Sequence, residues 1–301
     1  MNETHWQQVQ DKDRAERIAQ LESFIVNRGC SKSEAINKRD HVSSKPYLFI
    51  LETTSVCNLK CVMCPHGNDE APKPEHLKQE NLENITAFVQ TAESIQLTGL
   101  GEPLLSPMFW KALNTFSPLV AAKTKVISNG VLLNSERVKQ LLNSNLRQIS
   151  FSIDSCRPEV YAKIRGTKLE NILSNISKLM EMRNERKSHP MLIELNLTVM
   201  KENVEELEDY IDFASKLGAD KVCFQFLNEG YSNGDTTRWR VTKGSWTYIY
   251  AEQSIQNFPE LFKANLDKAI WRAKTLGLQL ELDSMKPYEK HQILAQPRGQ
   301  G

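Results

Sequence analysis

Residues 47–64 read YLFILETTSVCNLKCVMC, in which an apolar segment runs directly into three closely spaced cysteines. The apolar and β-branched residues over Tyr47–Thr53 predict a β-strand. Cys57, Cys61 and Cys64 follow it within eight residues, in a chain that has six cysteines. Clustered cysteines at such spacing are typical of metal or cluster ligands. The stretch therefore predicts a metal centre in a loop at the carboxyl end of the first strand.

After this stretch, short apolar segments continue to alternate with helical patterns. Further strands are expected at Ser94–Thr98, Thr124–Ser128, Gln148–Ser152, Leu192–Val199 and Lys221–Phe226. Helices are expected near Leu82–Ala92, Pro107–Phe116, Ser135–Asn143, Asn171–Asn184 and Val204–Leu217. This alternation predicts an α/β fold of parallel strands with right-handed crossovers. A partial barrel and a doubly wound open sheet both agree with it.

The two ends of the chain differ from this alternating segment. We divide the chain into an N-terminal helical arm, a core and a short C-terminal extension at residues 1–46, 47–228 and 229–301. The arm has apolar residues at helical spacing, and we expect it to pack as a cover on the core. In the extension we expect a loop, a helix and a weak last strand at Gly230–Gly244, Phe258–Leu276 and Leu278–Leu282.

Composition narrows the functional classes. The chain has 301 residues, 40% of them hydrophobic, and 38 basic against 37 acidic residues give a net charge of +1. This balance provides no electrostatic footprint for nucleic acid or for an anionic membrane. No run of eighteen apolar residues and no apolar signal segment is present, so we expect a cytoplasmic protein without a membrane partner.

The three clustered cysteines can support more than one kind of centre. Three thiolates can hold three irons of a [4Fe–4S] cubane and leave the fourth iron open. The amine and carboxylate of S-adenosyl-L-methionine (SAM) could then bind this open iron. A zinc site with His66 as the fourth ligand and a set of buried, inert cysteines remain alternatives. The scattered Cys30, Cys156 and Cys223 are expected to be small buried residues.

The pattern C-x3-C-x2-C after a first strand resembles the signature of the radical SAM superfamily, and the likeness extends from about residue 47 to 228. The segment Thr98-Gly-Leu-Gly-Glu-Pro103 resembles the Gly-Gly-Glu element that binds the methionine amino group in the family. This likeness implies Gly101 and Glu102 as SAM-binding residues. The segment Ser128-Asn129-Gly130 resembles the family's turn near the nucleoside, which implies Ser128 and Asn129 as SAM-binding residues, although turn chemistry alone explains Gly130.

The Ser-Ile-Asp motif at residues 152–154, followed by Tyr161 and Arg165, resembles one branch of the superfamily, the SPASM/twitch-type enzymes. The resemblance implies that Ser152 and Asp154 face SAM and that Arg165 pairs with its carboxylate. A helix cap at Asp154 and a surface ion pair at Arg165 are the alternatives for these residues. Met63 occupies the position where an aromatic residue commonly packs on adenine, and a thioether can pack there too.

The resemblance implies a partial (β/α)6 barrel and an enzyme that reductively cleaves SAM to a 5′-deoxyadenosyl radical. That radical would abstract hydrogen from a peptide or a small sugar-like metabolite, and flavodoxin or ferredoxin would supply the electron. An iron–sulfur electron-transfer protein without radical chemistry remains the alternative. The branch often carries C-terminal cysteines for auxiliary clusters, whereas this chain has none after Cys223, which favours a redox-neutral rearrangement or an epimerisation. Asn196, Gln225 and Asn228 are candidates for substrate contact, although hydrogen bonds within the fold are the favoured use of these amides.

Overall fold

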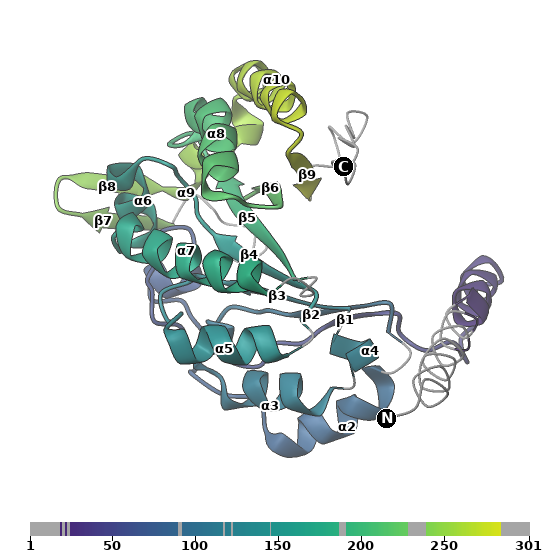
Figure 1. Ribbon diagram of the computed structural model, residues 1–301. Helices are drawn as coiled ribbons and strands as arrows, with labels where there is room; N and C mark the ends of the chain where they lie inside the picture. Colours follow the sequence, from purple (N-terminus) through teal and green to yellow (C-terminus); the bar gives the residue numbers. More distant parts are fainter. Residues whose placement is uncertain are drawn as a thin grey trace.

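A single curved sheet of parallel strands organises the protein in a computed structural model that describes residues 19, 22, 25–89, 92–116, 118–121, 123–144, 146–186, 191–227 and 239–283. Its strands lie in the order β1, β2, β3, β4, β5, β6 and β9. Their bounds are Leu48–Ile50, Ser94–Leu97, Thr124–Ser128, Gln148–Ser152, Leu192–Val199, Lys221–Phe226 and Gln279–Asp283. All neighbouring strands pair in parallel, and the sheet forms a half-barrel (Figure 1).

The strand order decides between the two architectures that the alternation allowed. Each strand from β2 to β6 lies beside the one that precedes it in the chain. A doubly wound sheet instead reverses its strand order at a switch point. The partial barrel is therefore confirmed, as are the six expected strands, although β1 is shorter than predicted. The weak last strand is also present, as β9, and it extends the sheet beside β6.

Helices cover one face of the sheet, as crossover connections require. The main helices are α2 Gln79–Val89, α3 Pro107–Thr115, α4 Pro118–Ala121, α5 Ser135–Asn143, α6 Pro158–Arg165, α7 Leu169–Glu185, α8 Leu207–Leu217 and α10 Pro259–Leu276. Ile193, Leu195 and Leu197 of β5 belong to the main apolar core. The alternate residues Asn196 and Thr198 line a cavity instead, because successive strand residues point to opposite faces.

An antiparallel hairpin lies where the sequence predicted only a loop. Its strands are β7 Arg240–Lys243 and β8 Trp246–Ile249, and the short helix α9 Tyr250–Gln253 follows. The prediction of a loop through Gly244 is therefore wrong for β7, while residues 230–238 lie outside the described residues. The many small polar residues hid a strand whose apolar members, Val241 among them, pack on a second apolar cluster around Val62.

The described part of the N-terminal arm contains a helix over residues 25–36. Its apolar residues Ile25, Val26 and Ile36 are 70%, 70% and 69% exposed, so this helix does not cover the core as expected. An ion pair of 2.8 Å between Arg28 and Glu93 links it to the rest of the chain. Among the described residues, no helix has both the length and the apolar character needed to cross a membrane.

Candidate functional site

The cysteine loop lies at the carboxyl edge of the sheet, between β1 and a 3-10 turn at Pro65–Gly67. Cys61 is buried, while Cys57 and Cys64 are half-buried. The Cys64 N–H donates to the Cys61 carbonyl at 3.0 Å, and the Gly67 N–H donates to the Cys64 carbonyl at 2.7 Å. A Cβ at Gly67 would lie 2.1 Å from the Cys61 carbonyl oxygen, so this tight winding of the loop requires glycine there.

Two distant segments fix the loop at Val62, between the second and third cysteines. The Val62 N–H donates to the Ile164 carbonyl of α6 at 3.0 Å. The Trp239 indole N–H donates to the Val62 carbonyl at 2.9 Å, and Trp239 is almost fully buried just before the β7–β8 hairpin. Sequence reasoning missed Trp239, because nothing in its local sequence indicates a contact 177 positions away.

Side-chain hydrogen-bond donors face two of the three sulfurs. An Nη1 group of Arg165 lies 3.6 Å from Cys61 Sγ, and the Asn129 Nδ2 group lies 4.0 Å from Cys57 Sγ. Donors of this kind stabilise anionic sulfurs and tune the potential of iron–sulfur clusters. This environment fits the cluster that the sequence predicts.

Burial raises the pKa of all three cysteines in the metal-free protein, that of Cys64 to about 11. The nearby Arg165 lowers each pKa, but its effect is smaller than that of burial. The free thiols therefore stay protonated near neutral pH. Because only thiolates bind metal, loading of a cluster must release protons.

Within the described ranges, no three His, Cys, Asp or Glu side chains converge closely enough to hold one metal ion. A cubane cluster has no such requirement, because its cysteines bind different irons. The His66 Nε2 atom beside the loop is buried and has no hydrogen-bond partner.

Glu102 joins the two predicted SAM-binding turns. Its Oε1 atom accepts hydrogen bonds from the Leu104 N–H at 3.1 Å and the Ser128 hydroxyl at 2.8 Å. Its Oε2 atom accepts one from the Asn129 N–H at 2.7 Å. Burial raises the pKa of Glu102 and outweighs these hydrogen bonds, which lower it. The carboxylate is thus buried as a brace between turns, and its role in SAM binding stays a prediction.

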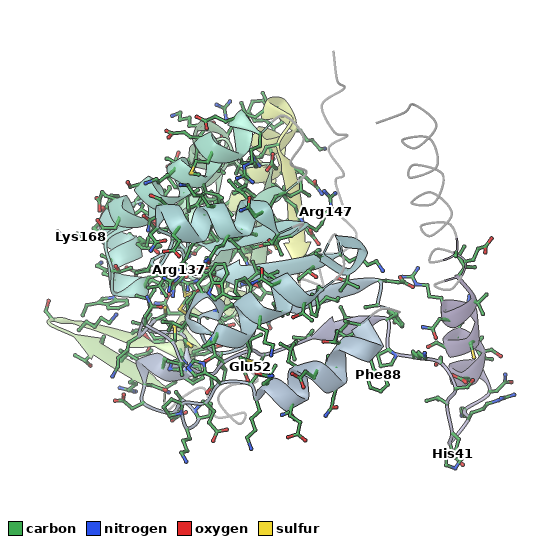
Figure 2. The ribbon with its side chains drawn as sticks, turned by 60° about the horizontal axis from the view of Figure 1, so that its bottom comes forward. His41, Glu52, Phe88, Arg137, Arg147 and Lys168 are labelled. Carbon is green, nitrogen blue, oxygen red and sulfur yellow. The ribbon has the colours of Figure 1, made fainter. Side chains whose placement is uncertain are left out.

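Both turns also contact the beginning of the cysteine loop. The Glu102 N–H donates to the Val56 carbonyl at 2.8 Å. A Cβ at Gly101 would lie 2.2 Å from the Thr54 carbonyl oxygen, so only glycine allows this approach. Asn129 Nδ2 donates to Asn58 Oδ1 at 2.9 Å. Glu52 (labelled in Figure 2) accepts the Leu100 N–H at 2.6 Å, which ties the first turn to the segment after β1.

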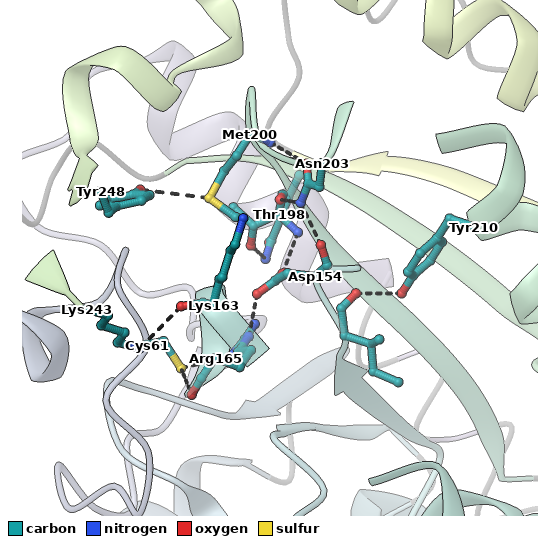
Figure 3. Close-up of polar contacts among 12 residues, drawn as sticks. Cys61, Asp154, Lys163, Arg165, Thr198, Met200, Asn203, Tyr210, Lys243 and Tyr248 are labelled. Carbon is teal, nitrogen blue, oxygen red and sulfur yellow. Dashed lines mark hydrogen bonds and ion pairs between the residues drawn. The ribbon is translucent and has the colours of Figure 1, made fainter. Parts of the chain in front are cut away.

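Asp154 and Arg165 form a buried ion pair (Figure 3). Asp154 Oδ2 accepts from Arg165 Nε, and Asp154 Oδ1 accepts from the Thr198 N–H at 2.9 Å. Burial lowers the pKa of Arg165, but Asp154 and Cys61 outweigh it and hold that pKa well above its usual value. Neither a helix cap at Asp154 nor a surface ion pair at Arg165 describes this geometry, because their side chains are 0% and 12% exposed.

A cavity of about 680 Å³ opens beside the cysteine loop. Met63 and Cys64 of the cysteine loop line it, together with Arg165 of α6 and with Asn196, Thr198 and Gln225 of β5 and β6. Asp154 is fully buried, so it positions Arg165 for the cavity. Ser152 ends β4 beside Asn196, while Asn228 lies outside the described residues. The structure thus brings Met63, Cys64 and Arg165 together, as the resemblance implied.

Comparison with known proteins identifies the family of this cavity-bearing half-barrel. The sequence profile of the radical SAM superfamily matches residues 51–214, more than half of the chain. The chain belongs to the radical SAM superfamily. The radical SAM match spans the cysteine loop, both turns and the Asp154–Arg165 pair. Members of the superfamily are enzymes that bind SAM and carry an iron–sulfur cluster, so the expected class of protein is confirmed.

The relatives of this radical SAM chain are distant. An AdoMet-dependent heme synthase from Methanosarcina barkeri is 28% identical over 181 residues, which cover 59% of this chain and 50% of the relative. A GTP 3′,8-cyclase from Alkaliphilus oremlandii is 26% identical over 245 residues, which cover 77% of this chain and 69% of the relative. The chain thus spans about half to two thirds of the length of these relatives.

Among solved structures, Streptococcus suis SuiB bound to its precursor peptide SuiA shares the fold. The TM-score is 0.61 at 16% sequence identity, and the match covers 83% of this chain and 51% of SuiB. An identity this low shows that the half-barrel fold is shared.

Proposed function

We propose that this chain is a radical SAM enzyme in which Cys57, Cys61 and Cys64 hold a [4Fe–4S] cluster. When bound, the reduced cluster supplies an electron to SAM and so yields a 5′-deoxyadenosyl radical, which abstracts hydrogen from a substrate. The observation that carries the proposal is the shared cavity: Met63 and Cys64 of the cysteine loop line it together with Arg165. A cofactor bound there would lie against both the open iron and a cation.

The chain's own residues have separate tasks in this proposal. Arg165 pairs with the SAM carboxylate, and Asp154 holds the guanidinium in place through its Nε atom. The turn at Gly101 receives the methionine amino group, while Glu102 braces that turn against Ser128 and Asn129. Met63 packs on the adenine, since a polarisable thioether makes favourable contacts with aromatic rings.

The substrate belongs to one of two classes, a peptide or a small sugar-like metabolite. SuiB, which shares the fold, binds a precursor peptide, and this is consistent with the first class. A flavodoxin or ferredoxin would deliver the electron. An auxiliary cluster would need further cysteines after Cys223, and the described residues contain none there. We therefore propose no chemistry at an auxiliary cluster for this part of the chain.

Anaerobic reconstitution tests the proposal. The protein is loaded with iron and sulfide, reduced and mixed with SAM, and 5′-deoxyadenosine is measured by mass spectrometry. We expect 5′-deoxyadenosine from the wild type and none from the Cys57→Ala variant. The control is Cys223→Ala, which changes a buried cysteine on β6. A loaded wild-type cluster that binds SAM without cleaving it, with and without candidate peptides and sugars, would instead support an electron-transfer protein.

A further inference from the structure

On the face of the sheet that lines the cavity, polar side chains lie at two levels along the strands. The two levels differ in whether the hydrogen-bonding atoms of these side chains have partners. The lower level is a closed network. Lys221 Nζ pairs with Glu194 Oε2 at 2.8 Å and also contacts Glu281. Glu194 Oε1 accepts from the Ser150 hydroxyl at 2.6 Å, and Gln148 Nε2 donates to Ser150 Oγ at 3.0 Å. Here the side chains of four neighbouring strands satisfy one another.

The upper level lies toward the carboxyl edge on the same strands and is open. Asn196 is 4% exposed, and its Oδ1 atom is buried without a hydrogen-bond partner. Gln225 Nε2 donates to Thr198 Oγ1 at 3.3 Å, and both residues line the cavity together with Asn196. A buried polar atom without a hydrogen-bond partner costs free energy, so this carbonyl oxygen calls for an explanation, such as a bound ligand.

We infer that Asn196 is a substrate-binding residue and that it receives an uncharged hydrogen-bonding group, a hydroxyl or a carboxamide, of the substrate. The inference rests on the proposed function, because the cavity that Asn196 lines also contains Met63, Cys64 and Arg165. Rotation of the terminal torsion exchanges Oδ1 and Nδ2, so the side chain can turn either atom toward the cavity.

The charges around the cavity explain why this group is neutral. Arg165 is the one charged side chain that lines the cavity in the described part of the chain, and Asp154 already pairs with it. Glu194, Lys221 and Glu281, one step down the same strands, are already paired with one another in the closed network, which leaves no free cation for a second anion. A substrate phosphate or carboxylate at Asn196 would therefore be buried without a counter-ion. A hydroxyl or carboxamide would satisfy the unpaired amide at no such cost.

The size of the cavity limits the substrate further. Pockets of about 300–1,000 Å³ usually enclose one drug-sized ligand. At about 680 Å³ the cavity lies within this range, and SAM alone is a ligand of that class, so a substrate group that shares the cavity must be small. A single side chain of a peptide or one small metabolite agrees with this space, so the carboxamide of an asparagine or glutamine and the hydroxyl of a serine are suitable peptide groups.

The first test compares two asparagines under the same substitution. Asn203 is fully buried like Asn196, but its Nδ2 donates to the Asp154 and Thr198 carbonyls and its Oδ1 accepts from the Met200 N–H. We expect Asn196→Leu to raise the melting temperature of the substrate-free protein by ~2 °C, because it removes an unpaired amide. We expect Asn203→Leu to lower it by several degrees. A lower melting temperature for both variants would overturn the inference.

The second test uses four capped tripeptides with a central asparagine, serine, aspartate or phosphoserine as probes. Each is added to the reconstituted protein with SAM, and the rate of 5′-deoxyadenosine formation is divided by the rate without a probe. We expect the two neutral probes to stimulate the wild type about tenfold more than the charged probes, as one well-made buried hydrogen bond allows. In Asn196→Leu the stimulation by the neutral probes should disappear. In Asn196→Asp the neutral probes should stimulate no more than the charged probes do.

The outcomes separate this inference from the proposed function. If the wild type forms no 5′-deoxyadenosine at all, the proposed function fails, and the melting comparison still tests Asn196. If SAM is cleaved but the charged probes stimulate as well as the neutral ones, or no probe stimulates, the substrate class is wrong. If Asn196→Leu loses affinity for SAM in calorimetry, Asn196 contacts the cofactor and the inference is overturned.

Discussion

The closed network in the sheet and the cysteine loop at its edge are stabilised in different ways. Glu194, Lys221 and Glu281 come from adjacent strands, and their positions follow from strand register. The cysteine loop has an irregular backbone, and it is held by Arg165 and Trp239, which lie 104 and 177 positions away from the residues they contact. We conclude that the network mainly provides stability, whereas the loop mainly provides chemistry.

The largest expected effect is the loss of a cluster ligand. Cys61→Ala should abolish iron binding and 5′-deoxyadenosine formation, because two of the three expected cysteine ligands remain. It should change the free energy of unfolding of the metal-free protein little by comparison. Iron content and urea unfolding check both points. Retention of full iron in this variant would remove Cys61 from the ligand set.

Breaking the closed network should have the opposite effect to Cys61→Ala: it should lower stability and leave iron binding intact. Lys221→Met leaves the buried Glu194 without its cation, and this should lower the free energy of unfolding by about 3 kcal/mol. The folded variant should still load iron. Lys263→Met is the control, because its ion pair with Asp267 is exposed to solvent and contributes little to stability. Equal destabilisation by both variants in urea would contradict a structural network.

Trp239→Phe tests the link between the loop and the hairpin. The variant keeps an aromatic ring but removes the N–H that binds the Val62 carbonyl, at a cost of about 1 kcal/mol in stability. We also expect faster loss of iron to a chelator. Trp110→Phe is the matched control, since its indole N–H donates to the Leu104 carbonyl at 3.4 Å outside the cysteine loop. Identical rates of iron loss in the two variants would show that Trp239 does not position the loop.

The smallest expected effect is a pH dependence of the network. Burial lowers the pKa of Lys221, but Glu194 and Glu281 outweigh it and raise the pKa above the usual 10.5. Because the folded state holds this proton more tightly, the stabilisation is fully present below pH 10.5 and declines as the pH rises above that value. Urea unfolding at pH 9 and pH 11.5 should show a smaller decline for Lys221→Met than for the wild type. Equal declines would contradict the raised pKa.

The sheet could be predicted from the sequence because its signals are local. Apolar residues that face the core alternate along β5 with polar residues that face the other side of the sheet. Five of the six predicted core strands have bounds within one residue of those observed. The hairpin could not be predicted in this way. Both strands have four residues, β7 is mostly polar, and the hairpin is stabilised by packing on Val62 and Met200, which belong to distant segments.

The site shows the same division. The resemblance to the family's motifs indicated Met63, Cys64 and Arg165, which meet at one cavity. It did not indicate that the carboxylates of Glu102 and Asp154 are buried in hydrogen bonds with neighbouring turns, because those partners depend on the tertiary fold. Nor did it indicate that Asn196 Oδ1 lacks a partner, since satisfaction of a buried polar atom is a property of the packed structure.

Electron paramagnetic resonance of the reduced, reconstituted protein, recorded with and without SAM, tests the central claim most directly. If Cys57, Cys61 and Cys64 hold a [4Fe–4S] cluster with one open iron beside the cavity, SAM will bind that iron and change the cluster signal. The Cys61→Ala variant will show no such signal. A cluster whose signal is the same with and without saturating SAM would contradict the account.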